Sequence, residues 1–216
     1  MTPTALEARW HQLTAPLLPD AALREATYRQ LVRAYEAPER HYHSLEHIRR
    51  LLNTLDEHRD MVQDATVVEL AIWFHDAVYN PLRDDNEARS SQLAREFLEN
   101  TSLSKEQWAR VRFLIERTKD HSQPQPADDT DLHFFLDADL QILGAPEADY
   151  GQYAQQVRQE YRLVPDFLYR RGRRKVLEKL LSSSPLYRTN FFHQKLEEAA
   201  RYNLQAELSK WERGGL

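Results

Sequence analysis

The ten residues 70–79, LAIWFHDAVY, combine two properties that oppose each other in a folded protein. The run is almost wholly apolar, which predicts burial, yet His75 and Asp76 stand side by side near its end. Burying a carboxylate among apolar groups costs on the order of several kcal/mol unless something neutralises it. A bound cation would do so, with the neutral imidazole as a second ligand. The alternative is a His-Asp pair that lies exposed where a helix ends.

Composition excludes several kinds of site. The chain has 216 residues, a net charge of −5, no cysteine and only five glycines. The charge argues against a general nucleic-acid binder. The missing cysteines exclude disulfides, cysteine-based zinc sites and thiol nucleophiles. The scarce glycines argue against glycine-rich phosphate loops. The polar N-terminal residues predict no signal peptide, no apolar run is long enough to span a membrane, and we expect a cytoplasmic protein.

Hydrophobic periodicity is helical nearly everywhere, and no segment alternates as a strand would. We predict an all-α fold, a single helical bundle of about eight or more helices. Asp20, Ser44 and Ser104 are predicted N-caps, and residues 66–69 read as a capping box for the helix that carries the His-Asp pair, which should run to Asn80-Pro81. The other helices are expected at residues 5–13, 87–99, 132–143, 147–162, 166–182 and 190–211, with a loop at 120–130.

Two further polar residues are predicted to face inward. A cap at Ser44 would place His47 in the first turn of its helix, where the helix dipole favours the neutral imidazole that binds metal. Later in the chain, an apolar stripe at spacings of four, three and four includes Asp139, whereas Asp137 is rotated off it. A second carboxylate is thus expected on a core face.

His47, His75, Asp76 and Asp139 together form a mixed nitrogen and oxygen donor set. Such a set suits one divalent ion, either Mn²⁺, Fe²⁺, Co²⁺, Ni²⁺ or Zn²⁺ and, less well, Mg²⁺. Four ligands would leave coordination positions open for water and substrate. The alternative is that all four are satisfied core and cap residues.

Four motifs in order carry a resemblance to a known family. They are HYHSLEHI at residues 41–48, FHDAVY at 74–79, DNE at 85–87 and LDADL at 136–140. Their order and context resemble the HD-domain metal-dependent phosphohydrolase superfamily, most closely a poorly characterised bacterial branch. The match spans about residues 40–145, and the helical character continues beyond it.

The resemblance implies one HD-type domain over residues 1–216, with the metal-site core at about 40–145 and C-terminal helices at 146–216 packed on it. It implies metal ligation by His47, His75, Asp76 and Asp139, and hydrolysis of a phosphate ester or anhydride of a small molecule such as a nucleotide. Asp76 would also help to deprotonate the attacking water. Glu87 is a second catalytic candidate, although a glutamate in the first turn of a helix is also favoured by the dipole alone.

Four residues are candidates for substrate binding: His43, Asn86, Lys119 and His121. Each has a plainer interpretation as a structural or solvated loop residue, and His121 could also be a further metal ligand. The basic cluster at residues 170–175 is either a solvated helix face or a source of arginines for a substrate phosphate.

Two other functions stay open at this stage. Some HD-domain proteins are di-iron oxygenases, but that chemistry needs about two more histidines, and only His121 and His133 are available. A non-catalytic binding domain that keeps a structural metal is the third option. We expect a small phosphorylated partner, no nucleic-acid polymer and no membrane; the oligomeric state, including a homodimer, is left open.

Overall fold

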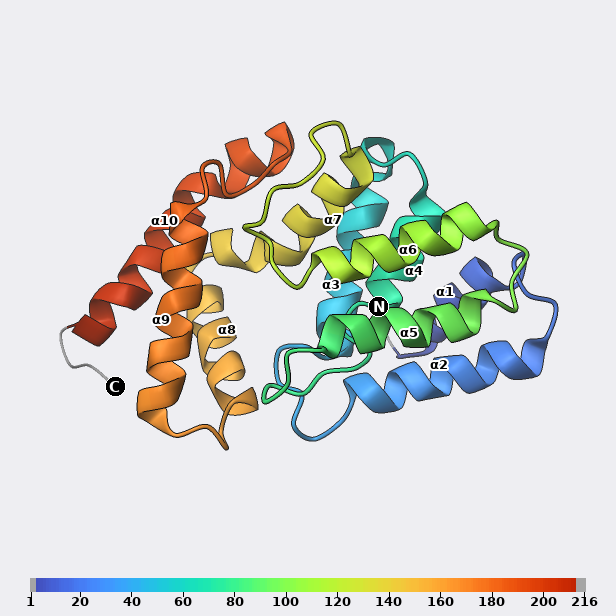
Figure 1. Ribbon diagram of the computed structural model, residues 1–216, viewed down its shortest axis with the longest axis horizontal. Coiled ribbons are helices and arrows are strands. Elements are labelled where there is room, and N and C mark those ends of the chain that lie inside the picture. The colour runs from blue at the N-terminus through green and yellow to red at the C-terminus, as the bar shows by residue number, and fades with distance from the viewer. Residues whose placement is uncertain (1–2, 213–216) are drawn as a thin grey trace. The chain divides into compact units, whose positions relative to one another are not determined.

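A computed structural model describes residues 3–212, and within that range the chain forms α-helices and short 3-10 helices but no strand. The predicted all-α class is therefore confirmed (Figure 1). Among the helices of the described range, none is both long and apolar enough to cross a membrane.

The chain divides into two compact units, Met1–Lys119 and Asp120–Leu216. The first unit contains α1 (Pro3–Thr14), α2 (Ala21–Tyr35), α3 (Leu45–Glu57), η1 (Arg59–Met61), α4 (Ala65–Phe74), α5 (Asn86–Leu98) and α6 (Lys105–Arg117). The second contains α7 (Thr130–Asp139), η2 (Leu140–Gly144), α8 (Glu147–Glu160), α9 (Asp166–Ser182) and α10 (Asn190–Glu212). That the whole chain acts as one HD-type domain stays a prediction.

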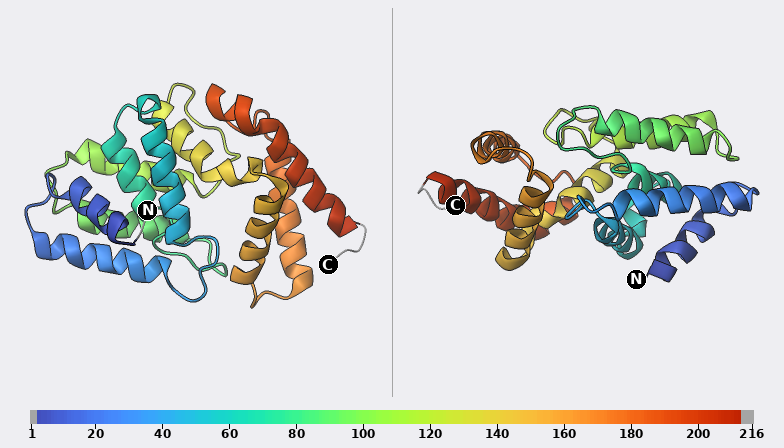
Figure 2. Two further views of the ribbon diagram at one scale, coloured as in Figure 1. Left: turned by 180° about the vertical axis from the view of Figure 1, so that it is seen from behind. Right: turned by 90° about the horizontal axis from the view of Figure 1, so that it is seen from below.

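Helix α4 is the centre of the first unit and packs against α3, α5 and α6 (Figure 2). All of its residues from 67 to 74 are buried, as its apolar sequence predicts. Trp10 of α1 closes one side, with its ring centroid 5.5 Å from that of Trp73 and 6.0 Å from that of Phe74. The His-Asp pair therefore follows directly on the most buried helix of the unit.

Two predicted helix starts are confirmed and one is wrong. Asp20 accepts a hydrogen bond from the backbone N–H of Leu23, and Ser104 forms a full capping box. Helix α4, however, begins at Ala65 with Asp64 as its N-cap, so residues 66–69 are not a capping box. Glu69 instead accepts a hydrogen bond of 2.7 Å from Arg9 of α1. A contact from a distant helix thus satisfies the carboxylate that the local pattern assigned to the cap.

Asp137 corrects a second expectation. It was predicted to lie off the core stripe, yet it is fully buried. Its carboxylate accepts hydrogen bonds from the backbone N–H groups of Arg188 and Thr189 and from the Thr189 hydroxyl, at 2.7 to 3.0 Å. Burial raises the pKa of Asp137, and these hydrogen bonds oppose that rise. Asp137 therefore anchors the segment that leads into α10.

Gly144 ends η2 where α10 comes closest. A Cβ atom at this position would lie 2.6 Å from the Leu196 Cβ and 2.9 Å from the Leu196 carbonyl oxygen. Glycine is thus a packing requirement at this position, because only a residue without a side chain permits this approach. The Tyr187 hydroxyl donates to the Leu140 carbonyl at 3.0 Å and ties the segment before α10 to the start of η2.

We predict that Gly144→Ala lowers the free energy of unfolding by about 1–3 kcal/mol, since the methyl group meets backbone atoms that cannot move aside. Gly172→Ala is the matched control, because a Cβ there meets nothing within 4 Å. The control should gain up to about 1 kcal/mol from better helix propensity. Urea denaturation followed by circular dichroism measures both; equal stabilities for the two variants would contradict the packing role of Gly144.

Candidate metal centre

His75 and Asp76 lie just beyond the end of α4 rather than on it. The helix ends at Phe74 with His75 as its C-cap, six residues before the predicted stop at Asn80-Pro81. The His75 side chain is 1% exposed, whereas that of Asp76 is 17% exposed. The pair therefore stands at a boundary, with the imidazole inside and the carboxylate reaching toward solvent.

His47 meets this pair from α3. It occupies the first turn, as predicted, and its Nε2 atom lies 3.2 Å from Nε2 of His75. The Asp76 Oδ2 atom lies 3.1 Å from the same His75 nitrogen and 4.0 Å from Nε2 of His47. Two imidazoles and one carboxylate of the first unit thus present their ligand atoms to one point.

The tautomer of His75 makes this arrangement unusual. Its Nδ1 atom lies 2.9 Å from the Ile72 carbonyl oxygen, and a carbonyl can only accept, so Nδ1 carries the proton. In the neutral ring Nε2 is then an acceptor, which lies 3.2 Å from Nε2 of His47 and 3.1 Å from the carboxylate oxygen of Asp76. Two acceptors at 3.1 Å repel each other unless a positive charge lies between them. That charge is either a second proton on His75 or a metal ion.

Ser44 lies at the predicted N-cap position of α3, but its side chain makes no capping hydrogen bond there. Its hydroxyl faces the Tyr42 carbonyl oxygen instead, at 3.4 Å. The helix start, and with it the position of His47, was predicted correctly, whereas the capping contact was not.

Arg40, which sequence reasoning missed, braces both sides of the site. Its guanidinium donates to the carbonyls of His43 at 3.0 Å and Ala77 at 3.4 Å. The same group lies over the rings of Tyr35 and Tyr79, at 5.4 and 4.9 Å from their centroids. It thereby links the loop before α3 to the turn after His75. The one sequence feature that could have pointed to Arg40 is its position directly before the HYHSLEHI motif.

Ser90 of α5 fixes the turn from a third direction. Its hydroxyl oxygen lies 3.0 Å from the Val78 backbone nitrogen and 3.2 Å from the Val78 carbonyl oxygen. One small side chain thus pairs both backbone groups of a residue that no helix satisfies. Contacts of this kind hold ligands in place and tune a metal site from outside its first shell of ligands.

In the second unit, Asp139 is the last residue of α7 and is half-buried. Its Oδ2 atom lies 3.1 Å from Nε2 of His121, whose other ring nitrogen is buried without a hydrogen-bond partner in the described structure. His121 therefore lies beside Asp139, as one of its predicted roles requires. Asp139 stays a predicted ligand of the ion, since it belongs to the second unit whereas His47, His75 and Asp76 belong to the first.

The remaining candidates of the first unit differ in how they are engaged. The His43 ring packs on the Tyr79 ring with centroids 4.4 Å apart. Both ends of the Asn86 amide bond to the backbone of Asn80, each at 2.9 Å, which holds the loop before α5. Lys119 is exposed and donates to the Asp84 carbonyl, and Glu87 is half-buried in the first turn of α5. Their predicted roles stay predictions.

We predict that Arg40→Gln weakens Mn²⁺ binding by about 10-fold, because ligand positions loosen when an outer hydrogen-bonding partner is lost. Isothermal titration calorimetry measures the affinity. Arg29→Gln is the control, since Arg29 is exposed on α2 and pairs only with Glu25 among the described contacts. Unchanged affinity in folded Arg40→Gln would show that Arg40 does not support the site.

The chain matches no protein-family model, no curated protein and no solved structure. A helical fold by itself serves many unrelated activities, so the chemistry of the site is what bears on function.

Proposed function

We propose that this chain is a divalent-metal-dependent phosphohydrolase of the HD type, with His47, His75, Asp76 and Asp139 as ligands of one ion. The observation that supports it most is the pair of acceptors at 3.1 Å, His75 Nε2 and Asp76 Oδ2, with His47 Nε2 beside them. A metal ion would lie between the His75 nitrogen and the Asp76 oxygen and could take His47 Nε2 as a third ligand, whereas a proton would join only the first two atoms.

The four residues fit such an ion by chemistry as well. Imidazole nitrogens with carboxylate oxygens suit Mn²⁺, Fe²⁺, Co²⁺, Ni²⁺ and Zn²⁺, and the donor set leaves positions for water and for a phosphoryl oxygen. When bound, the ion would supply a polarised phosphoryl oxygen and a water of lowered pKa. We assign Mn²⁺ as the first ion to test.

The residues around the ligands would handle the proton and the substrate. We propose that Asp76 accepts a proton from the attacking water, because its carboxylate is the ligand that reaches solvent. Glu87 is the second base candidate, half-buried and close in sequence to the motif. His43, Lys119 and His121 are proposed contacts to the phosphate of a small molecule such as a nucleotide. Asn86 has the weakest support, since its amide already holds the preceding loop.

The di-iron alternative receives no support from the donor groups. In the part of the chain that the structure describes, two groups of His, Asp or Glu residues could hold an ion, and neither contains His133. A non-catalytic domain with a structural metal differs from the proposal in one measurable respect: it would bind metal and ligand without turnover.

We predict that Mn²⁺ or Co²⁺ activates release of phosphate from a panel of nucleotides and sugar phosphates. His75→Ala and Asp76→Ala should each lower the rate by at least about 100-fold, the loss expected when an electrostatic stabiliser of the transition state is removed. His193→Ala is the control, because His193 is exposed on α10 and pairs with Glu197. A malachite-green phosphate assay measures all four proteins.

Absence of turnover on the whole panel with every metal would contradict the hydrolase proposal. Metal binding retained in that case would select the non-catalytic domain, and iron content near two per chain would revive the oxygenase.

A further inference from the structure

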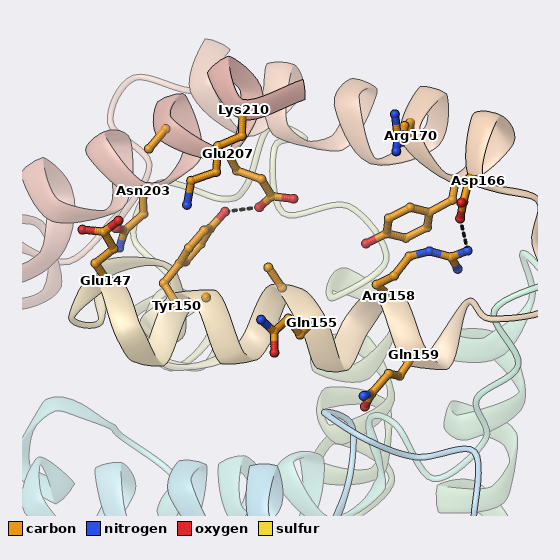
Figure 3. A pocket seen from close by; sticks show the side chains of 14 residues that line it. Glu147, Tyr150, Gln155, Arg158, Gln159, Asp166, Arg170, Asn203, Glu207 and Lys210 are labelled. Atoms are coloured by element: carbon orange, nitrogen blue, oxygen red, sulfur yellow. Dashed lines mark hydrogen bonds and ion pairs between the residues drawn. The ribbon is translucent and has the colours of Figure 1, made fainter. Parts of the chain in front are cut away.

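The second unit contains a cavity of about 550 Å³ between α8, α9 and α10 (Figure 3). Its described lining residues all belong to this unit, and none of the proposed metal ligands is among them. A volume of this size is typical of sites for small organic molecules. The cavity is therefore a candidate binding site separate from the proposed function.

A buried ionic network forms part of its wall. Arg173 donates from Nε and Nη2 to the two oxygens of Glu207, each at 3.0 Å, and the Tyr150 hydroxyl donates to Glu207 at 2.5 Å. Both Arg173 and Glu207 are 8% exposed. Arg173 is thus buried, which contradicts the interpretation of the basic cluster at residues 170–175 as a solvated helix face at this position. The network fixes the Tyr150 ring and the Glu207 carboxylate beside the cavity.

A buried ion pair is a poor way to gain stability, because desolvation of the two charges offsets their attraction. Well-packed apolar residues of similar volume often replace a buried ion pair without loss of stability. Stability alone therefore does not explain the ionic network. A role in holding the Tyr150 ring and the Glu207 carboxylate in fixed positions beside the cavity does explain it.

A glycine of α8 leaves part of the lining without a side chain. Gly151 lies inside α8, where glycine costs about 1 kcal/mol relative to alanine. A Cβ atom there would meet nothing within 4 Å, so no neighbour requires the glycine. Ala154 follows one turn later on the same helix face and also lines the cavity. These two small residues leave the cavity side of α8 apolar and without large side chains.

The charges that remain favour a negative ligand. Among the charged residues of the lining, Arg158 pairs with Asp166, and Glu207 is neutralised by Arg173. Three are left, Glu147, Arg170 and Lys210, and within the described residues none of them makes an ion pair. Their sum is one positive charge. The two cations of this set belong to α9 and α10, whereas Gly151 belongs to α8.

We propose that this cavity binds a planar aromatic molecule that carries one negative group. The ring would lie against Gly151 and Ala154, between the aromatic side chains of Tyr150 and Tyr169, which both line the cavity. The negative group would pair with one of the two cations of the lining, Arg170 on α9 or Lys210 on α10. Aromatic surface supplies most of the affinity in such sites, and a few polar groups fix the orientation.

A pair of probes with the same ring and opposite charge tests the proposal on the full chain. We expect 1-naphthoate to bind wild type at least about 10-fold more tightly than 1-naphthylmethylammonium, a difference of about 1.4 kcal/mol. Gly151→Leu, which fills the open space, should weaken 1-naphthoate binding by at least about 10-fold. Gly172→Leu is the matched control, because Gly172 is a helical glycine with equally free surroundings that does not line the cavity. Its affinity should equal that of wild type.

Circular dichroism and thermal unfolding check that each variant folds. Should Gly151→Leu fail to fold, the double variant Arg170→Gln/Lys210→Gln decides, since it should lose the preference for the anionic probe while the cavity stays intact. The proposal is overturned if wild type does not bind 1-naphthoate or binds both probes equally. It is also overturned if Gly151→Leu and Gly172→Leu change affinity alike, or if the double variant keeps the preference.

Discussion

The hydrogen bond between His75 Nδ1 and the Ile72 carbonyl is the interaction on which the site depends. It joins the ring to the last turn of α4, fixes which nitrogen carries the proton, and turns Nε2 toward His47 and Asp76. A helix end normally leaves such carbonyls unsatisfied, so the imidazole caps the helix and is oriented by it in the same contact. The nitrogen and oxygen atoms that this brings together could accept a cation. Other contacts of the first unit hold these residues in place.

The fold serves this geometry by enclosing α4 on several sides. Its eight buried residues pack against three helices, and the Tyr35 hydroxyl donates to the Trp73 carbonyl at 3.0 Å just before the helix ends. Arg40 and Ser90 then fix the turn that carries Asp76. Preorganisation of this kind is what a metal site needs, because ligands that must be ordered on binding reduce the affinity.

Local patterns predicted the helices and the inward-facing histidines, because hydrophobic periodicity, helix caps and apolar stripes depend on residues that are close in sequence. Three of the errors share one cause, which is contact between distant segments. The local pattern assigned Glu69 to a helix cap, but its carboxylate pairs with Arg9 of α1. The helix phase placed Asp137 off the core face, but the segment before α10 covers it. Arg173 was likewise placed in a basic cluster, while its partner Glu207 lies 34 residues away. A helical wheel identifies one apolar stripe as the buried face, whereas a helix that is covered on two sides buries residues on two faces.

The most direct test of the central claim is to locate the ion. Crystals grown with Mn²⁺ and measured at its absorption edge should give one strong anomalous peak at about 2.0–2.3 Å from Nε2 of His47 and His75, the distance of metal–nitrogen bonds. Carboxylate oxygens of Asp76 and Asp139 should complete the ligands. A map with no peak there, and with a hydrogen-bonded imidazolium–carboxylate pair between His75 and Asp76, would contradict the account and assign the positive charge to a proton.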